Sequence, residues 1–255
     1  MRAPLDRAIR SLRSALRRRR QQAQFQRQFE EFSKLPGADR FPLRWSDRLP
    51  RLGEDTPTTG FDRHYVYHPA WAARILHKLG PRVHVDIGSS LFFVSVLSAF
   101  VRTEAYDYRP AEVRLDGLRT GSADLTALHF ADRSIESLSC MHVVEHIGLG
   151  RYGDRLDPNG DLKATSELQR VLAPEGSLLL VVPVGRPQLR FNGHRIYSYD
   201  QIVTSFAELE LTEFALIPEL GPEGWIAGAT PHQVAAQEYG CGCFWFQRPG
   251  RELDD

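Results

Sequence analysis

From about residue 80 onward, short apolar segments alternate with longer segments whose apolar residues recur at helical spacing. Runs of about four to eight apolar or β-branched residues between turn residues are typical of buried strands. The pattern predicts strands at Val83–Asp86, Glu104–Asp107, Ile135–His142, Ser177–Val182, Leu211–Ile217 and Cys243–Gln247.

Helical periodicity lies between these strands and once before them. It predicts helices near Pro69–Leu79, Phe92–Val101, Leu162–Leu172 and Asp200–Ala207. The last helix has a start signal, because Ser198 followed three residues later by Gln201 fits a capping box. Alternating strands and helices predict an α/β domain, a mostly parallel sheet with helices on both faces. No helix-sized periodic segment separates the last two strands, which predicts an antiparallel last strand.

The first 34 residues predict a long helix with two apolar stripes. The second stripe begins after Arg17–Arg20 and lies about half a turn round the helix axis from the first. The first stripe is Leu5, Ile9, Leu12 and Leu16, and the second is Phe25, Phe29 and Phe32. Residues 1–34 are therefore predicted to form a basic amphipathic helical arm.

Residues 35–68 are rich in proline, glycine, aspartate and threonine and have no sustained period, which is typical of a linker. We expect this linker to wrap the surface, with Trp45 as its anchor. Residues 69–255 then form the globular α/β domain.

Charge divides the chain at the same place. Residues 1–34 contain ten basic and three acidic residues, a net charge of +7, so the rest of the formally neutral chain carries −7. Two interpretations of the arm stay open. It binds an anionic membrane surface or another polyanion, or it is solvated and its phenylalanine end packs against its own domain or a second subunit in a homodimer. Nucleic acid is not the expected substrate of the net acidic domain.

Apolar runs and cysteines limit the class of protein. The longest apolar run, Leu178–Val182, is far shorter than the roughly 20 residues of a membrane-spanning helix. Arginines occupy the N-terminus, where a signal peptide needs an apolar segment, so we expect a cytoplasmic protein. The three cysteines are too few for a four-cysteine zinc site or a disulfide framework. We therefore expect no metal and a reduced, structural pair at Cys241 and Cys243.

Acidic residues follow the ends of successive strands. Asp86, Asp107 and Asp124 lie at or just after such ends, and a loop that begins at Glu145 follows another. In open α/β sheets, ligands bind beyond the carboxyl ends of the strands, where the strand order reverses. Gly88 permits a tight turn there, and Asp107 is placed to accept hydrogen bonds from a ribose.

The turn after the first strand excludes one class of nucleotide site. A dinucleotide-binding dehydrogenase requires the pattern G-x-G-x-x-G. Residues 88–93 read GSSLFF and match only its first position. A dehydrogenase is therefore disfavoured.

Four motifs resemble, in order and spacing, those of class I S-adenosylmethionine-dependent methyltransferases. They are VDIG at 85–88, DLTALHFADRSIE at 124–136, VEHI at 144–147 and LAPEGSLLL at 172–180. The resemblance covers residues 80 to about 217 and implies a Rossmann-like class I methyltransferase fold that binds S-adenosylmethionine. It implies that Asp107 binds the ribose, that Asp124 and Leu125 flank the adenine, and that the segment after Cys140 lines the methionine end. The predicted cofactor-binding residues are Asp86, Gly88, Ser89, Ser90, Asp107, Asp124, Leu125 and His142.

Longer stretches resemble a narrower subgroup, bacterial methyltransferase-like proteins known only as a domain of unknown function. They are IGSSLFFVSVLSAF, HIGLGRYGD, NGDLKATSELQRVL and PVGRPQLRFNGHRIYSYDQI. The resemblance implies that the GSS turn is this subgroup's own form. Because Ser90 and Phe92 carry side chains where glycine would leave the backbone bare, we expect hydroxyl hydrogen bonds and apolar contacts to hold the cofactor. A further resemblance to proteins of surface-polysaccharide synthesis implies a sugar or nucleotide-sugar acceptor.

Two loops with histidines are candidates for the acceptor site. If the acceptor is a hydroxyl, His146, beside Glu145 after the fourth strand, is predicted to be the general base. The alternative is a structural histidine bonded to a nearby backbone carbonyl. His194 is the second candidate for the base.

The loop that carries His194 is rich in polar residues. Its predicted substrate contacts are Asn192, Arg195 and Tyr197, because arginine forks bind phosphate or carboxylate groups. A solvated basic loop is the alternative at this place. For the whole protein, a non-catalytic cofactor- or ligand-binding module on the same fold also stays open.

Overall fold

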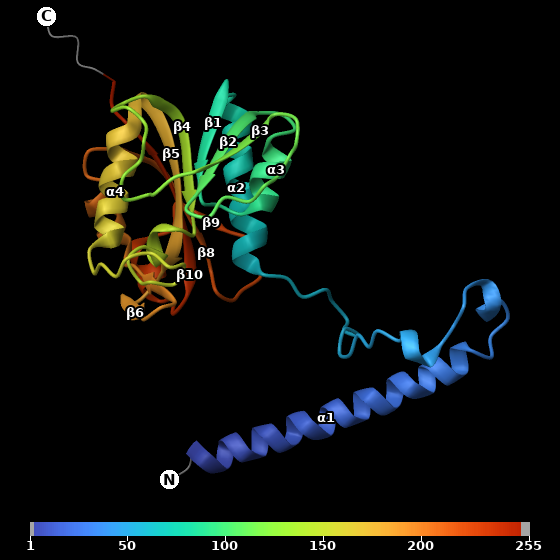
Figure 1. Ribbon diagram of the computed structural model, residues 1–255. Coiled ribbons are helices and arrows are strands. Elements are labelled where there is room, and N and C mark those ends of the chain that lie inside the picture. Colours follow the sequence, from blue (N-terminus) through green and yellow to red (C-terminus); the bar gives the residue numbers. More distant parts are fainter. Residues whose placement is uncertain (1–2, 251–255) are drawn as a thin grey trace, which may run out of the picture. The chain divides into compact units, whose positions relative to one another are not determined.

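A computed structural model of the protein describes residues 3–250, with side chains described from residue 11 onward (Figure 1). The chain divides into two compact units, one ending at Phe61 and the other beginning at Asp62. The side chains of Leu5 and Ile9, which belong to the first apolar stripe, lie outside the described residues. Among the helices within residues 3–250, none has both the length and the apolar character needed to cross a bilayer.

The first unit contains one long helix, α1 (Ala3–Phe32), and two short 3-10 turns, Ala38–Arg40 and Trp45–Asp47. The rings of Phe25 and Phe29 pack on Trp45, with centroids 5.9 and 4.9 Å away. Trp45 therefore anchors the segment after the helix to the second apolar stripe of α1, and the predicted wrapping of the surface stays a prediction. The side chains of Leu12 and Leu16, on the first stripe, are 64% and 50% exposed.

The second unit is built on an eight-stranded sheet with the order β3-β2-β1-β4-β5-β10-β8-β9. A separate two-stranded hairpin lies outside this sheet. The strands are β1 (Val83–Ile87), β2 (Arg102–Asp107), β3 (Leu118–Ser122), β4 (Ile135–Met141), β5 (Leu172–Val184), β8 (Glu210–Ile217), β9 (Ile226–Ala227) and β10 (Gly240–Gln247), with β6 (Gln188–Arg190) and β7 (His194–Ile196) in the hairpin.

Strand direction agrees with the sequence pattern. The first five strands are mutually parallel, and β10 runs antiparallel to both of its neighbours, β5 and β8. The chain moves outward from β1 through β2 to β3 and then returns to place β4 on the other side of β1. The strand order therefore reverses between β1 and β4, which is where an open α/β sheet binds its ligands.

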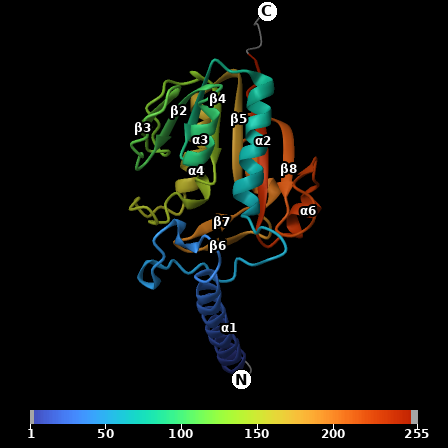
Figure 2. The ribbon, with the colours of Figure 1, turned by 90° about the vertical axis from the view of Figure 1, so that its right-hand side faces the viewer.

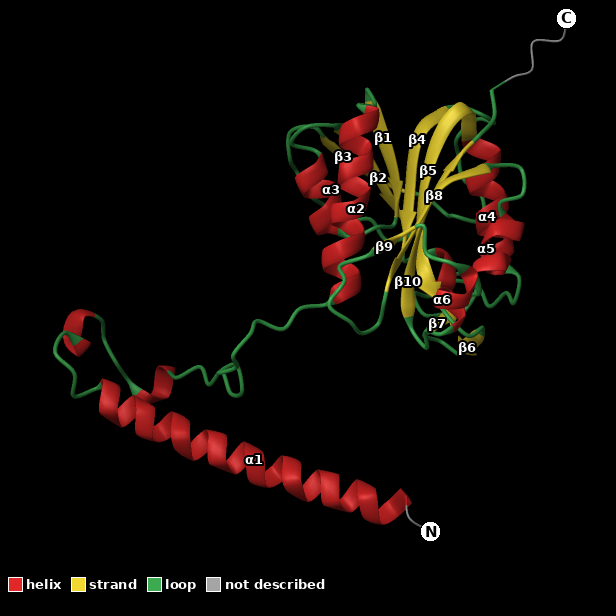
Figure 3. Cartoon of the chain, turned by 180° about the vertical axis from the view of Figure 1, so that it is seen from behind, coloured by secondary structure: helices red, strands yellow, loops and turns green. Residues whose placement is uncertain are grey.

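Helices cover both faces of the sheet, as predicted (Figure 3). The helices α2 (Arg63–Leu79) and α3 (Leu91–Leu97) lie on one face, and Figure 2 shows α2 crossing it. The other face carries α4 (Gly160–Val171), α5 (Tyr199–Ser205) and α6 (Pro231–Ala235). The predicted capping box at the start of α5 is confirmed, because Ser198 and Gln201 exchange side-chain-to-backbone hydrogen bonds of 3.1 and 2.9 Å.

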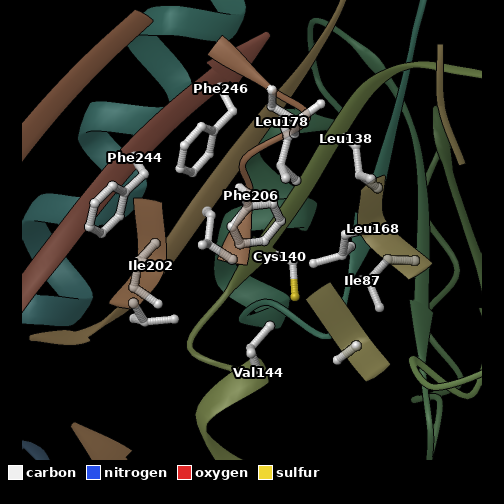
Figure 4. Close-up of a cluster of buried hydrophobic side chains, with 14 of the residues drawn as sticks. Ile87, Leu138, Cys140, Val144, Leu168, Leu178, Ile202, Phe206, Phe244 and Phe246 are labelled. Carbon is white, nitrogen blue, oxygen red and sulfur yellow. The ribbon is translucent and has the colours of Figure 1, made fainter. Parts of the chain in front are cut away.

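Each face has its own apolar core. Figure 4 shows the core under α4 and α5, where Phe206, Phe244 and Leu178 are fully buried. Burying one large apolar side chain contributes about 1.5–3 kcal/mol to folding. Trp71 and Leu76 of α2 fill the opposite core with the side chains of Cys241 and Cys243. Both cysteines are free and buried, which agrees with the expected reduced state.

The helix α2 begins earlier than the sequence pattern predicts. It starts at Arg63, where the Asp62 carboxylate caps it by accepting a hydrogen bond of 3.1 Å from the Tyr65 N–H. Pro69, predicted to be its first residue, lies inside the helix. Proline favours the first turn because it has no N–H to donate, but one proline is tolerated here where the rest of the helix packs on the sheet. The α/β unit therefore begins at Asp62 and not at residue 69.

Other elements lack the apolar periodicity that predicts a strand or a helix. The edge strand β3 reads LRTGS, which lacks the apolar alternation that marks a strand. The hairpin of β6 and β7 consists of two three-residue strands in which only Ile196 is buried. The helix α6 has only five residues, and its one signal is the capping box of Thr230 and Gln233. Such short elements are stabilised by their neighbours and not by their own pattern.

Candidate functional site

A cavity of about 440 Å³ lies where the strand order reverses. It is lined at the carboxyl ends of β1 to β4 and by the loop that leads into α4. Six of the residues predicted from the sequence line it together: Gly88, Asp107, Asp124, Leu125, His142 and His146. Its volume is within the range of about 300–1,000 Å³ that small-molecule sites occupy.

The turn at Gly88 fits tightly under the cavity. Gly88 has φ = 72°, and its N–H donates to the Tyr106 carbonyl over 2.7 Å. A Cβ at this position would lie 3.0 and 3.1 Å from the two methyl groups of Val143, which also lines the cavity. Any other residue here would have a strained backbone, and its side chain would be crowded by Val143.

Asp86 supports the turn from below. Its side chain is 1% exposed, accepts the Ser89 N–H over 3.0 Å and accepts a short hydrogen bond from the Ser139 hydroxyl. Burial raises the pKa of Asp86 to about 6, although these hydrogen bonds oppose the rise. Asp86 does not line the 440 Å³ cavity. In this structure Asp86 holds the turn, and its predicted direct contact with the cofactor stays a prediction.

The two serines of the GSS turn also serve the protein's own backbone. The Ser89 hydroxyl oxygen accepts the Met141 N–H over 3.1 Å, and the Ser90 oxygen accepts the Phe93 N–H over 3.3 Å as the cap of α3. The Phe92 side chain is 88% exposed. The hydroxyl oxygens therefore brace the turn against β4 and α3, and cofactor binding by these two serines stays a prediction.

Two acidic residues of the cavity, Asp107 and Asp124, are held by the backbone that follows them. Oδ1 of Asp107 accepts the Arg109 N–H over 2.7 Å. The other oxygen, Oδ2, lies 3.7 Å from where a Cβ of Gly88 would be, so it faces the glycine turn. Oδ1 of Asp124 accepts both the N–H and the hydroxyl of Thr126, over 2.8 and 2.7 Å. Each carboxylate is therefore oriented before any ligand binds.

The loop HIGLGRYGD forms another wall of the cavity. Oδ2 of Asp154 accepts the N–H groups of Gly148 and Gly150 over 2.8 and 3.3 Å. Burial opposes ionisation of Asp154, yet the hydrogen bonds from the backbone lower its pKa. The Arg109 guanidinium lies over the ring of Tyr152, 4.6 Å from its centroid. Arg109 and Tyr152 both line the cavity, and neither was predicted from the sequence. The glycines on either side of the Arg151–Tyr152 pair, Gly150 and Gly153, could have marked Tyr152.

A buried pair follows β4. His142 has φ = 59°, a strained value for a residue other than glycine. Its Nδ1 lies 2.9 Å from Oε1 of Glu145, whose side chain is 1% exposed. The second oxygen, Oε2, has no hydrogen-bond partner among the described residues. A buried carboxylate oxygen without a partner is costly, so this position needs an explanation.

The surroundings of His146 fit both interpretations made from the sequence, a general base and a structural histidine. Its Nδ1 lies 2.7 Å from the Gly193 carbonyl, the contact expected of a structural histidine. A carbonyl can only accept, so Nδ1 carries the proton and Nε2 keeps its lone pair in the neutral ring. The Arg151 guanidinium lies 3.2 and 3.4 Å from the two ring nitrogens. Burial lowers the pKa of His146; Arg151 adds to the effect and Glu145 opposes it.

His194 lies on β7, close to His146. The two ring centroids are 6.5 Å apart, and the His194 ring is 4.9 Å from that of Tyr239. Burial lowers the pKa of His194, and the Arg190 cation lowers it further. Asn192 lies in the exposed turn of the hairpin, where its amide donates to the Leu149 carbonyl over 3.4 Å. Neither His194 nor Asn192 lines the 440 Å³ cavity.

Arg195 and Tyr197 hold segments of the protein together. Arg195 donates to the carbonyls of Ile147 and Pro158 over 2.7 and 3.2 Å. The buried Tyr197 hydroxyl donates to Asp161 over 3.0 Å. These contacts occupy the groups that were expected to bind substrate, so both residues are structural in this arrangement.

A group of residues from α2 and β10 surrounds His142 and was missed entirely. The His64 ring stacks on His142 at 5.5 Å, and that of His68 meets it edge-on at 5.0 Å. Sγ of Cys241 lies 3.6 Å from Nε2 of His142. His64 and His68 share a helix face with Trp71, a spacing that could have extended the predicted helix backward.

Comparison with known proteins begins with sequence. A family described as "Caenorhabditis protein of unknown function, DUF268" matches residues 126–213. Among curated proteins, none matches the chain. The family match lies within residues 80 to about 217, the stretch over which the chain resembles the methyltransferases.

Solved structures give the clearer result. A 1,6-didemethyltoxoflavin-N1-methyltransferase of Burkholderia thailandensis, with bound S-adenosylhomocysteine, is 13% identical with a TM-score of 0.51, over 71% of this chain and 78% of that one. The N-methyltransferase NodS of Bradyrhizobium japonicum, also with S-adenosylhomocysteine, is 15% identical with a TM-score of 0.50, over 71% and 85% of the two chains. The fold is that of the class I methyltransferases. The fold class predicted from the sequence is confirmed.

Proposed function

We propose that the protein transfers a methyl group from S-adenosylmethionine to a hydroxyl of a small polar acceptor. One observation carries this proposal: a single cavity joins Gly88, Asp107 and Asp124 on the cofactor side to His142 and His146 on the other. The two solved methyltransferases of the same fold hold S-adenosylhomocysteine, the product of such a transfer.

The cofactor side of the cavity suits an adenosine. Oδ2 of Asp107 faces the glycine turn, where it can accept hydrogen bonds from ribose hydroxyls. The buried Leu125 side chain offers an apolar surface for the adenine ring. When bound, the sulfonium of S-adenosylmethionine supplies a good leaving group. The protein then has to position the acceptor and remove its proton.

His146 is placed to remove that proton. Because Nδ1 is held by the Gly193 carbonyl, Nε2 carries the lone pair that a base requires. The lowered pKa keeps the ring neutral at pH 7. S-adenosylmethionine, held by Gly88, Asp107 and Asp124, would supply the methyl group, and Nε2 of His146 would accept the proton that the acceptor hydroxyl loses.

Cations near the histidines favour an acceptor with an anionic group. The guanidinium groups of Arg109 and Arg151 lie 4.6 and 5.0 Å from the centroid of the Tyr152 ring. Arginines bind phosphate and carboxylate oxygens in forked pairs. A nucleotide-sugar carries both a phosphate and free hydroxyls, and we propose this class as the acceptor, together with simpler sugars. A role in surface-polysaccharide synthesis follows from that proposal.

Calorimetry tests the cofactor assignment. One hydrogen bond to a charged group contributes about 1.5–3 kcal/mol, so Asp107→Ala should weaken S-adenosylmethionine binding by about tenfold or more. Asp116→Ala, which removes an exposed carboxylate between β2 and β3, is the matched control and should bind as wild type does. Lack of binding by the wild-type protein, with either S-adenosylmethionine or S-adenosylhomocysteine at high micromolar concentration, would refute the proposal.

A further inference from the structure

We propose that His64, His142 and Cys241 form a binding site for a soft divalent cation, with zinc the best match. They come from α2, from the end of β4 and from β10, and all three are buried. One nitrogen from each histidine and the Cys241 sulfur lie within 4.8 Å of one another. The sequence offered no such site because these residues are far apart in the chain.

The spacing of the ligand atoms suits tetrahedral coordination. Zinc binds histidine nitrogen at about 2.0–2.1 Å and cysteine sulfur at about 2.3 Å, so a nitrogen and a sulfur on one tetrahedral ion lie roughly 3.5–3.6 Å apart. Nε2 of His142 lies 3.6 Å from Sγ of Cys241. The remaining pairs lie within 4.8 Å, so the His64 side chain has to move closer to the other two ligands before all three can bind one ion.

Glu145 completes a pattern found around metal ions. A histidine that binds a metal through one nitrogen usually donates its other N–H to a carboxylate. Nδ1 of His142 lies 2.9 Å from Oε1 of Glu145, which leaves Nε2 directed at Cys241. Oε2 of Glu145 is buried and has no partner among the described residues. A cation beside His142 accounts for this buried negative charge.

Packing alone explains these contacts poorly. A thiol is a weak hydrogen-bond donor and a weak acceptor, so Cys241 is a poor partner for a buried imidazole nitrogen. Cys243, two residues along β10 and equally buried, packs in the same apolar core without belonging to the histidine group. It shows what a purely structural cysteine looks like on this strand. Imidazole and thiolate ligands together favour zinc or copper over magnesium or calcium, which prefer oxygen.

Three protein ligands leave one tetrahedral position open, as in catalytic zinc sites. His142 also lines the 440 Å³ cavity, so the ion adjoins the place proposed for the acceptor. We assign the open position to an oxygen of the acceptor, which the ion would orient and acidify. This second role rests on the proposed methyl transfer, whereas binding of the cation does not.

Metal titration of the untagged full-length protein tests the site. After dialysis against a chelator, the protein is titrated with Zn²⁺ by calorimetry and with Co²⁺ by absorption spectroscopy. We expect one ion per chain, and a near-ultraviolet charge-transfer band that reports a cobalt–thiolate bond. Absence of that band, or of stoichiometric Zn²⁺ binding, in the wild-type protein overturns the proposal whatever the variants do.

Matched variants assign the ligands. Cys241→Ser and His64→Gln should each weaken Zn²⁺ binding by about 100-fold or more, and Glu145→Gln by about 10- to 100-fold. Cys243→Ser and the exposed His77→Gln, on the same strand and the same helix, should bind as wild type does. Equal affinities in the Cys241 and Cys243 variants would overturn the assignment. Calorimetry with S-adenosylmethionine is independent, so zinc binding without cofactor binding refutes only the methyl transfer.

Discussion

Among the single residues, His146 decides whether the cavity is a catalytic site. We expect His146→Gln to lower the rate of S-adenosylhomocysteine release about 100-fold or more, because loss of a general base typically costs 10²- to 10⁴-fold. Cofactor affinity should stay within a few-fold of wild type. The measurement needs a sugar or nucleotide-sugar acceptor, found by screening for release of S-adenosylhomocysteine.

The comparison with His194 supplies the control. His194 does not line the cavity, so His194→Gln should keep most of the turnover. Wild-type turnover in His146→Gln would remove His146 from the mechanism. A parallel loss of stability and cofactor binding would make it structural.

The pH dependence is a separate test of the same residue. Burial lowers the pKa of His146 below its ordinary value of about 6.5. A base must be unprotonated, so the rate should fall only as the pH drops through this lowered pKa and should change little above about pH 7.5. A rate that still rises steeply above pH 7 would show that another group removes the proton.

Among the elements of the α/β unit, the loop between β4 and α4 depends on glycine. Gly148 has φ = 79°, and a Cβ there would lie 2.0 Å from the Asp157 carbonyl oxygen. Gly153 has φ = 86° in the same loop, but nothing lies within 4 Å of its Cβ position. Alanine at either site meets the left-handed backbone cost of about 1–2 kcal/mol, and only Gly148 adds a clash.

We therefore expect Gly148→Ala to lower the free energy of unfolding by more than Gly153→Ala does, by about 1–3 kcal/mol. It should also weaken S-adenosylmethionine binding, since the loop lines the cavity. Urea unfolding and calorimetry measure the two effects. If the two variants are equally stable, the loop relaxes without cost and its contact with Asp157 is not a constraint.

For the chain as a whole, the two units should be separable. Deleting residues 1–61 removes the first unit and leaves the one that begins at Asp62 with its helix cap intact. We expect the shortened protein to unfold cooperatively, with a melting temperature close to that of the full chain and unchanged cofactor affinity. An aggregated or unfolded product would show that the units depend on each other.

The same deletion also tests whether the arm binds an anionic membrane surface. Residues 11–20 are all exposed and include Arg13 and Arg17–Arg20. We expect the full chain, and not the shortened one, to bind anionic vesicles, and added salt to weaken binding because exposed charges are screened over about 8–10 Å. Salt-insensitive binding, or a full chain that forms dimers and ignores vesicles, would favour the interpretation in which the arm contacts a second subunit.

The layout of the α/β unit can be read from the amino-acid pattern. Strands such as Ser177–Val182 are apolar enough to be found by pattern alone, and their alternation with helices dictates a mostly parallel sheet. Parallel strands bring their carboxyl ends to one edge, so the order of the strands suffices to assign residues such as Asp107 and His146 to one cavity. Local signals, including the Ser198 cap, are equally readable because the residues that make them are neighbours in the chain.

Three-dimensional packing, by contrast, selects which side chains face the cavity and which brace it. Asp86 and Ser89 lie within two residues of Gly88, yet their polar atoms turn inward to β4 and to each other. The grouping of His64 with Cys241 depends on α2 lying against β10, and no periodicity within either segment encodes that contact. Pattern and spacing act over a few residues, whereas packing brings together side chains that are distant in the chain.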